Sequence, residues 1–377
     1  MSTQVLSTCV PGNTSFADFK SWAQAISSWM ATIGWTQTND TGQVVWTATV
    51  LTCTQVAMTG TTAVISYSSF TGPAPRQGMS FTFSGFSNSG NNTSLTTTAV
   101  SGGSSGTVTC TNASGVSETH AGSGTTTALS ASPATSTITA YELWQATDSL
   151  SSTTPMIVKF EYGTSATANA YQFAFTAATG SNGSGTLTGN VSTRFLSSSN
   201  SVGTTGVGNN AVFSGSTGRF AIAMFINASN ASNGFFVGVE RSHNSSGADT
   251  SNYFMAVALQ NVSATHSPFQ QIIQNPSLGG ALTAETAFIT ALTTLSSGVA
   301  GTNIALGPMF PVIGLLDNPC MMLAFSKGGD IVEGATVTVP YFGSNHTMYC
   351  TKASAWVTGL PTGSASITSN GLLIRFE

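Results

Sequence analysis

Charged residues are scarce in this chain. Asp, Glu, Lys and Arg make up 6% of its 377 residues, against about 25% in typical soluble domains. The formal net charge is -4, and no basic stripe of the kind that phosphate binding requires is present, so no nucleic-acid partner is expected. Hydrophobic residues still reach 41%, with 22 Phe and 6 Trp. Disordered chains have few aromatics, so we expect a folded protein.

Features of membrane, secreted and disulfide-rich proteins are also missing. No apolar run reaches the 18 or so residues of a spanning helix, and "MSTQVLSTCVPG" lacks the basic and apolar segments of a signal peptide. We therefore expect synthesis in the cytoplasm, with no membrane insertion and no signal-peptide secretion. The cysteines are odd in number and lack CxxC or Cys/His spacing, which predicts mostly free, buried thiols. They are Cys9, Cys53, Cys110, Cys320 and Cys350.

Motifs of catalytic and cofactor sites are absent as well. There is no GxSxG, Walker A or GxGxxG unit in the required context, and the four histidines show no metal-ligand spacing. We expect no enzyme activity, no cofactor and no bound metal. The surface must instead be built from Ser, Thr, Asn and Gly, and its low charge gives little repulsion between copies. That composition favours a homo-oligomer held in an assembly.

One amphipathic helix is predicted near the start of the chain. Ser15 and Asp18 resemble a capping box, and Gly34 supplies the stop. Trp29 lies near the flank of the apolar face and Trp35 follows the stop, so we expect the helix to lie on a sheet with aromatics in the seam. The face itself is formed by Phe19, Trp22, Ala23, Ile26, Met30 and Ile33.

From Val44 onward the chain consists of short β runs broken by turn residues. Runs such as "VVWTATVLT", "AVISYSSF" and "MSFTFSGF" alternate with separators such as "SNSGNN", which predicts a small sandwich or barrel over residues 45–132. Strand patterns resume with "TITAYELW" and "PMIVKFEYG". We therefore predict a mainly β protein in which residues 1–44 and 133–377 form a sandwich or jelly-roll-like domain with one N-terminal helix.

The few charged residues receive a structural interpretation. Glu142 and Asp148 could form a catalytic carboxylate pair, but we expect Asp148 to cap a turn and Glu142 to pair with Lys159 or to end at a strand edge. Lys159 and Glu161 alternate and should share one sheet face. Glu161 is expected to pair with Arg194.

Two sets of surface contacts are predicted. Residues in three turn-rich loops could contact a sugar or a protein by hydrogen bonding and stacking; they are Arg76, Asn91, Asn92, His243 and Asp249. Residues expected to contact other copies in an assembly combine aromatic anchors with lone charges; they are Trp22, Trp29, Trp35, Trp144, Lys159, Glu161 and Arg194.

Five segments carry a resemblance to a known family. "SFADFKSW", "GWTQTNDTGQV", "YELWQATDSL", "PMIVKFEYG" and "GTLTGNVSTRF" resemble a family of tailed-bacteriophage virion structural proteins, over residues 13–43 and 137–195. In that family "DTGQ" leads within a short connection to the "YELW" segment, so the resemblance implies that residues 45–132 are an insert. The insert itself is similar to small β modules that decorate virion proteins, and we expect an immunoglobulin-like module.

The resemblance implies a place in a phage particle and contact with other virion proteins. The first expectation is a structural component of the tail, the baseplate or an appendage; capsid decoration comes second. A receptor-binding adhesin or lectin that contacts a host-surface glycan is the competing class. A polysaccharide-degrading spike enzyme would require close acidic side chains in a cleft and is not expected.

Overall fold

A computed structural model describes residues 4–6, 19–129, 138–164, 171–196, 210–225, 233–244, 248–262, 265–274, 282–283, 304–307, 323–327, 336–341, 344–352 and 370–375. Within these ranges the chain is mainly β with one α-helix, α1 (Phe19–Thr32), which confirms the predicted fold class. The expected cap at Ser15 and Asp18 lies outside the described residues.

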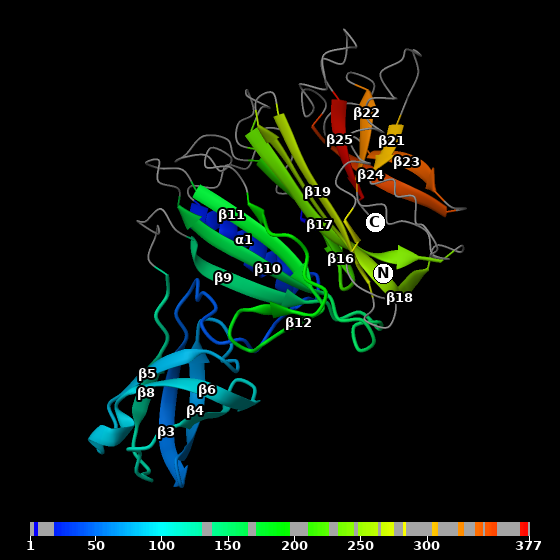
Figure 1. The fold of residues 1–377 in the computed structure, drawn as a ribbon. Coiled ribbons are helices and arrows are strands. Elements are labelled where there is room, and N and C mark those ends of the chain that lie inside the picture. Colours follow the sequence, from blue (N-terminus) through cyan, green and yellow to red (C-terminus); the bar gives the residue numbers. More distant parts are fainter. Residues whose placement is uncertain are drawn as a thin grey trace.

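Two antiparallel sheets make up the larger body in Figure 1. The first, in spatial order, consists of β14 (Phe195–Leu196), β11 (Tyr171–Ala178), β10 (Ile157–Thr164), β9 (Ile138–Gln145) and β2 (Thr36–Gln37). The second consists of β1 (Gln4–Leu6), β15 (Asn210–Ser216), β16 (Arg219–Phe225), β17 (Asn233–His243), β18 (Asp249–Val262), β19 (Thr265–Gln274) and β20 (Leu282–Thr283). Strands β9 to β11 and β15 to β19 pair in chain order, which is a meander and not the Greek-key order of a jelly roll.

Aromatic side chains join the two sheets face to face. The ring of Phe160 on β10 lies 5.7 Å from that of Phe220 on β16, and Phe175 on β11 lies 6.2 Å from Phe220. Strand alternation points Val158, Phe160 and Tyr162 inward, and all three are fully buried. We call these two sheets, together with α1, the host sandwich.

Helix α1 contacts both sheets of the sandwich. Its Trp29 stacks on Phe213 of β15 with ring centroids 5.2 Å apart, while Ser27 Oγ donates to Glu142 of β9 at 2.8 Å. The helix ends as predicted at Gly34, whose φ is +89°. Gly34 N–H donates to Ala31 and Trp35 N–H donates to the Met30 carbonyl, which is a Schellman motif that occupies the last free carbonyls.

Short segments cover both long edges of the five-stranded sheet. Beyond β2, the N–H of Thr38 donates to Leu143 and that of Val44 to Tyr141, each at 2.9 Å. On the opposite edge, the N–H of Ser192 donates to Ala177 at 2.7 Å. These segments therefore occupy backbone groups along the edges of β9 and β11 that would otherwise be open to a strand from another chain.

The smaller body is a closed six-stranded barrel. Its strands pair in the order β3-β4-β7-β6-β5-β8 around the ring. Closure distinguishes it from the two open sheets of the expected immunoglobulin-like module. The bounds are β3 (Val50–Thr59), β4 (Thr62–Thr71), β5 (Ser80–Ser84), β6 (Ser94–Gly102), β7 (Gly106–Thr111) and β8 (Gly122–Thr125).

The barrel has a hydrophobic core separate from that of the host sandwich. Phe81 and Phe83 lie at its centre with Cys53 and Cys110, and both cysteines are free and buried, as predicted. Burial raises the pKa of each of these thiols to about 12. Cys9 and Cys320 lie outside the described residues, as does the side chain of Cys350.

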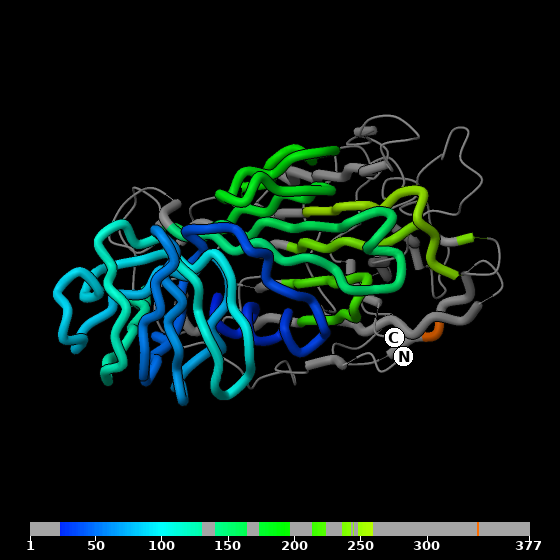
Figure 2. The backbone as a smooth tube through the Cα atoms, turned by 90° about the horizontal axis from the view of Figure 1, so that it is seen from below, coloured from blue at the N-terminus to red at the C-terminus, as the bar shows by residue number. Residues whose placement is uncertain are grey.

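The chain enters and leaves the barrel at one point. The N–H of Leu129 donates to the Val45 carbonyl at 2.8 Å, and the N–H of Thr126 donates to the Thr49 carbonyl at 3.0 Å. Figures 1 and 2 both show the barrel, in blue and cyan, as a separate body at one end of the host sandwich. All six strands fall within residues 45–132, the range predicted for an independent module.

Two further β units complete the described fold. A hairpin of β12 (Gly180–Ser181) and β13 (Leu187–Thr188) lies near the barrel end of the host sandwich. A third sheet lies toward the C-terminus, in the order β21-β22-β25-β24-β23. Its bounds are β21 (Ile304–Gly307), β22 (Leu323–Lys327), β23 (Thr336–Tyr341), β24 (Ser344–Lys352) and β25 (Asn370–Arg375).

Candidate functional site

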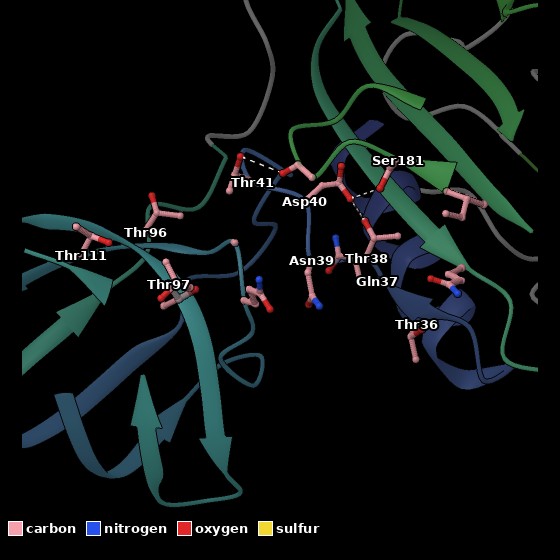
Figure 3. Close-up of a pocket in the computed structure, with 16 residues that line it drawn as sticks. Thr36, Gln37, Thr38, Asn39, Asp40, Thr41, Thr96, Thr97, Thr111 and Ser181 are labelled. Carbon is pink, nitrogen blue, oxygen red and sulfur yellow. Dashed lines mark hydrogen bonds between the residues drawn. The ribbon is translucent and has the colours of Figure 1, made fainter. Parts of the chain in front are cut away.

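A polar groove of about 710 Å³ lies where the barrel meets the host sandwich (Figure 3). One wall is formed by β2, the turn at 38–41 and the β12 end of the hairpin. The other wall is formed by Gln77, Gly78 and strand β6 of the barrel. Figure 3 shows Thr96 and Thr97 on the barrel side and Asn39 on the host side, across the open space.

Among the described residues that line the groove, Asp40 is the only ionisable one, and its carboxylate already accepts hydrogen bonds. It accepts hydrogen bonds from Thr38 Oγ1 at 2.7 Å, Ser181 Oγ at 2.8 Å and the Gly185 N–H at 2.9 Å. Burial would raise the pKa of Asp40, but these hydrogen bonds outweigh it and lower the pKa below its usual value. Asp40 therefore ties the 38–41 turn to the hairpin and presents no free carboxylate to the groove.

Several neutral side chains on both walls keep their hydrogen-bonding capacity. Among the described residues, Asn39 and Gln145 on the host side and Gln77 on the barrel side form no side-chain hydrogen bond within the chain. Asn39 and Gln77 are both exposed. Amides offer donors and acceptors together, so the groove can bind a ligand that offers both.

A close contact places the barrel against the host sandwich. Gly78 has a φ of +84°, and a Cβ at this position would lie 2.7 Å from the carbonyl oxygens of both Asn39 and Asp40. Only glycine allows both this backbone conformation and this approach. Gly78 thus brings the two walls of the groove together.

A buried carboxylate lies below the same junction. Glu142 is 1% exposed and shares the inner face of the sheet with its cross-strand neighbour Phe160. Its carboxylate accepts from Ser27 at 2.8 Å, Trp46 Nε1 at 2.9 Å and Tyr162 Oη at 3.1 Å. Burial raises the pKa of Glu142 to about 6, although these hydrogen bonds act to lower it.

The predicted partner of Glu142 was wrong. Lys159 lies opposite Leu143 in the strand register, not opposite Glu142. Since Lys159 is on the outer face of the sheet and Glu142 on the inner face, the two side chains cannot meet. The signal for burial was present in the sequence: Glu142 alternates with Ala140 and Trp144, both of which are buried.

Arg76 lies at this junction and not on a free loop. It is half-buried, and together with Glu142 it lines a cavity of about 320 Å³ between α1, Trp46 and the 73–79 loop. Burial lowers the pKa of Arg76, while the nearby charges of Glu142 and Asp40 act to raise it. The prediction of an exposed loop contact therefore does not hold for this residue.

The remaining predicted charge pairs lie on the host sandwich. Arg194 Nε lies 2.7 Å from Glu161, as predicted, and Lys159 Nζ lies 3.8 Å from the same carboxylate. Lys159 also lies 4.7 Å from the centre of the Tyr141 ring. Arg194 is the most exposed of the three charged side chains, at 43%. Their role as assembly contacts stays a prediction.

Asp148 caps its turn as predicted but also has a partner that sequence reasoning missed. It accepts from Ser151 Oγ within the turn and forms a two-pronged ion pair with Arg241, whose side chain is fully buried. Arg219 and Glu240 form a separate pair at 3.8 Å. Glu142 and Asp148 thus have entirely different partners.

The predicted tryptophan contacts belong to the core. Trp29, Trp35 and Trp144 are between 1% and 4% exposed, and Trp35 Nε1 donates to the Ser216 carbonyl at 2.8 Å. Side chains that pack inside their own chain cannot also anchor a neighbouring copy, so these three are corrected to core residues. The side chain of Trp22 lies outside the described part of the chain.

The predicted loop contacts on the barrel are largely structural. Asn91 is 1% exposed and donates to Glu118, so its assignment as an exposed contact was wrong. Asn92 is exposed, but its amide binds both backbone groups of Phe86 at 2.9 Å. Burial acts to raise the pKa of Glu118, but hydrogen bonds from Asn91 and the backbone lower it.

Two predicted contacts remain at the β17–β18 turn. His243 pairs with Asp249 in the strand register, and Asp249 is exposed. The side chain of His243 is not among those described. A role for these residues in receptor contact stays a prediction.

No group of three or more His, Cys, Asp or Glu side chains suited to a metal ion occurs in the described residues. No helix in the same residues is long and apolar enough to cross a membrane. Neither a family model, nor a curated protein, nor a solved structure matches the chain. The resemblance to phage structural proteins therefore stays a prediction.

Proposed function

We propose that the chain is a structural component of a tailed-bacteriophage virion, assembled as a homo-oligomer in the tail, the baseplate or an appendage. The host sandwich makes the assembly contacts, and the barrel projects from it. The support comes from the resemblance of residues 13–43 and 137–195, the two-body layout and the character of the surface.

The observation that carries the proposal is that most of the described ionisable side chains are bound to other groups of the same chain. Ten ionisable side chains of the described part are engaged in ion pairs or hydrogen bonds within the chain. They are Asp40, Glu118, Glu142, Asp148, Lys159, Glu161, Arg194, Arg219, Glu240 and Arg241. The surface left over is formed mainly by hydroxyls, amides and backbone, and it carries little charge to keep copies apart. Such a surface suits a protein whose exterior is covered by neighbours in a particle.

The barrel shows this character most strongly. Arg76 and Glu118 are the only Asp, Glu, Lys or Arg residues within 45–132. Arg76 lies at the junction with the host sandwich, and Glu118 accepts from Asn91 and from the backbone N–H groups of Ser87 and Asn88. Because the barrel is closed, it has no free edge for strand addition. It can project from an assembly without extending it.

The proposal is tested by the protein content of particles. Particles of the phage whose genome encodes the chain would be banded on a density gradient, washed in high salt and quantified by peptide mass spectrometry. We expect several copies per particle, retained after the wash because the contacts depend little on charge. Detection only in the soluble fraction of infected cells would contradict the proposal.

A further inference from the structure

We propose that the groove between the barrel and the host sandwich is a binding site for a neutral oligosaccharide. The inference does not depend on the position of the chain in a particle. It rests on the lining of the groove, on the hydrogen bonds that already occupy the Asp40 carboxylate and on the free amides on both walls.

The lining excludes charged ligands. Apart from Asp40, every described residue that lines the groove is uncharged, and most carry a hydroxyl or an amide. Asp40 is 2% exposed, and its carboxylate already accepts three hydrogen bonds at 2.7–2.9 Å. The described lining offers no cation for phosphate, sialic acid or a uronic acid, and no free carboxylate for an amine.

The lining also excludes ligands that depend on stacking or on an apolar pocket. In the described part of its lining, the groove has no aromatic side chain, and Ile157 is the only large aliphatic residue. A nucleobase or an apolar cofactor would therefore find neither a stacking surface nor a hydrophobic wall. A neutral sugar carries hydroxyls that both donate and accept, as the lining does.

Size and position fit such a ligand. The volume of about 710 Å³ falls within the range of about 300–1,000 Å³ that small-molecule sites occupy. Both bodies contribute free amides, Asn39 and Gln145 from the host sandwich and Gln77 from the barrel. Since Gly78 fixes the separation of the walls, the site is formed before the ligand arrives, which lowers the entropy cost of binding.

Because no described aromatic side chain lines the groove to stack on a sugar ring, we expect weak binding of the oligosaccharide. Hydrogen bonds to a solvated sugar contribute little net free energy each, so a dissociation constant on the order of 1 mM is expected for one site. Several copies in one assembly would raise the overall affinity for a polymer that reaches more than one site.

The test uses the full chain and saturation-transfer NMR. Maltohexaose, cellohexaose, mannohexaose and chitohexaose would be offered at about 10 mM, well above the expected dissociation constant, alongside hexagalacturonate as a charged counterpart. We expect at least one neutral hexasaccharide to bind and hexagalacturonate to bind no better. Absence of binding by every neutral hexasaccharide, or stronger binding by hexagalacturonate, would overturn the proposal.

Matched variants test the location. Asn39→Ala combined with Gln77→Ala removes one exposed amide from each wall, and we expect about a tenfold loss of affinity. Gln55→Ala, on an exposed position of β3 outside the groove, should bind like the unaltered chain. Thermal unfolding would verify that all variants fold. Unchanged binding by the double variant would show that the sugar binds elsewhere and would overturn the assignment.

Discussion

The indole Nε1 of Trp46 donates a hydrogen bond to Oε1 of Glu142 at 2.9 Å. Trp46 follows directly on Val45, at which the chain turns toward the barrel, and Glu142 lies inside the host sandwich. The connection to the barrel is therefore anchored on a buried carboxylate. The protonation state of that carboxylate should affect the stability of the whole junction.

Glu142→Gln should change how stability depends on pH. The folded chain raises the pKa of Glu142 from its usual 4.5 to about 6, so it binds this proton more tightly than the unfolded chain does. The stability from this group is thus present below about pH 4.5 and is lost as the pH rises through about 6. The shift corresponds to about 2 kcal/mol. In urea unfolding, the free energy of unfolding of the variant should rise by that amount relative to the unaltered chain as the pH increases from 4 to 8.

Trp46→Phe provides the opposite change. It removes one donor to the charged form of Glu142, so the pKa should rise further and the loss of stability toward neutral pH should become larger. The free energy of unfolding of each variant is compared with that of the unaltered chain from pH 4 to 8. A difference that stays constant over this range would show that Glu142 does not titrate as described.

Arg241→Met should be strongly destabilising. Arg241 is fully buried and holds Asp148 with two nitrogen atoms, and removing one member of a buried pair costs about 3–5 kcal/mol. Arg194→Met is the matched control, because Arg194 is 43% exposed and an exposed pair contributes about 1 kcal/mol or less. Chemical denaturation measures the free energy of unfolding of both variants. Equal losses in the two variants would contradict the expected difference between the buried and the exposed ion pair.

Gly78→Ala should loosen the barrel from the host sandwich. The added Cβ would lie 2.7 Å from two backbone carbonyls at a φ of +84°, for which we expect a loss of about 3 kcal/mol. Gly60→Ala has a φ of +59° with open space around it and should cost only about 1 kcal/mol. Hydrogen exchange at residues 38–41 would report the loosening; unchanged protection there in Gly78→Ala would contradict it.

Residues 45–129 should fold alone as the barrel. The strands close on themselves, the core is separate and the two ends meet at Val45 and Leu129. Cooperative unfolding by circular dichroism is expected, with Cys53 and Cys110 resisting alkylation until the barrel unfolds, because both are buried and burial raises their pKa. Rapid labelling under native conditions would show that the barrel needs the host sandwich.

Local pattern predicted those parts of the structure that depend on neighbouring residues. The stop of the helix at Gly34 and the shared face of Lys159 and Glu161 follow from helix and strand periodicity. The six barrel strands lie within residues 45–132, where the sequence alternates short β runs with turn residues. Each of these features is determined within a few residues of the chain.

Features that depend on distant packing were missed or mistaken. Asn91 looks like a loop residue in sequence, yet it is buried because its amide serves Glu118 and the backbone of Val116. Local sequence predicts the turn that Asp148 caps, but its ion-pair partner Arg241 is 93 residues away. The groove arises only when Gly78 meets the 39–40 backbone, a contact that no local pattern indicates.

Electron cryo-microscopy of purified particles, at a resolution that shows side chains, would show whether the chain is a structural part of the particle. We expect repeated copies of the chain around a symmetry axis, with the host sandwich in the contacts and the barrel directed outward. Particles in which no density fits the chain would contradict it.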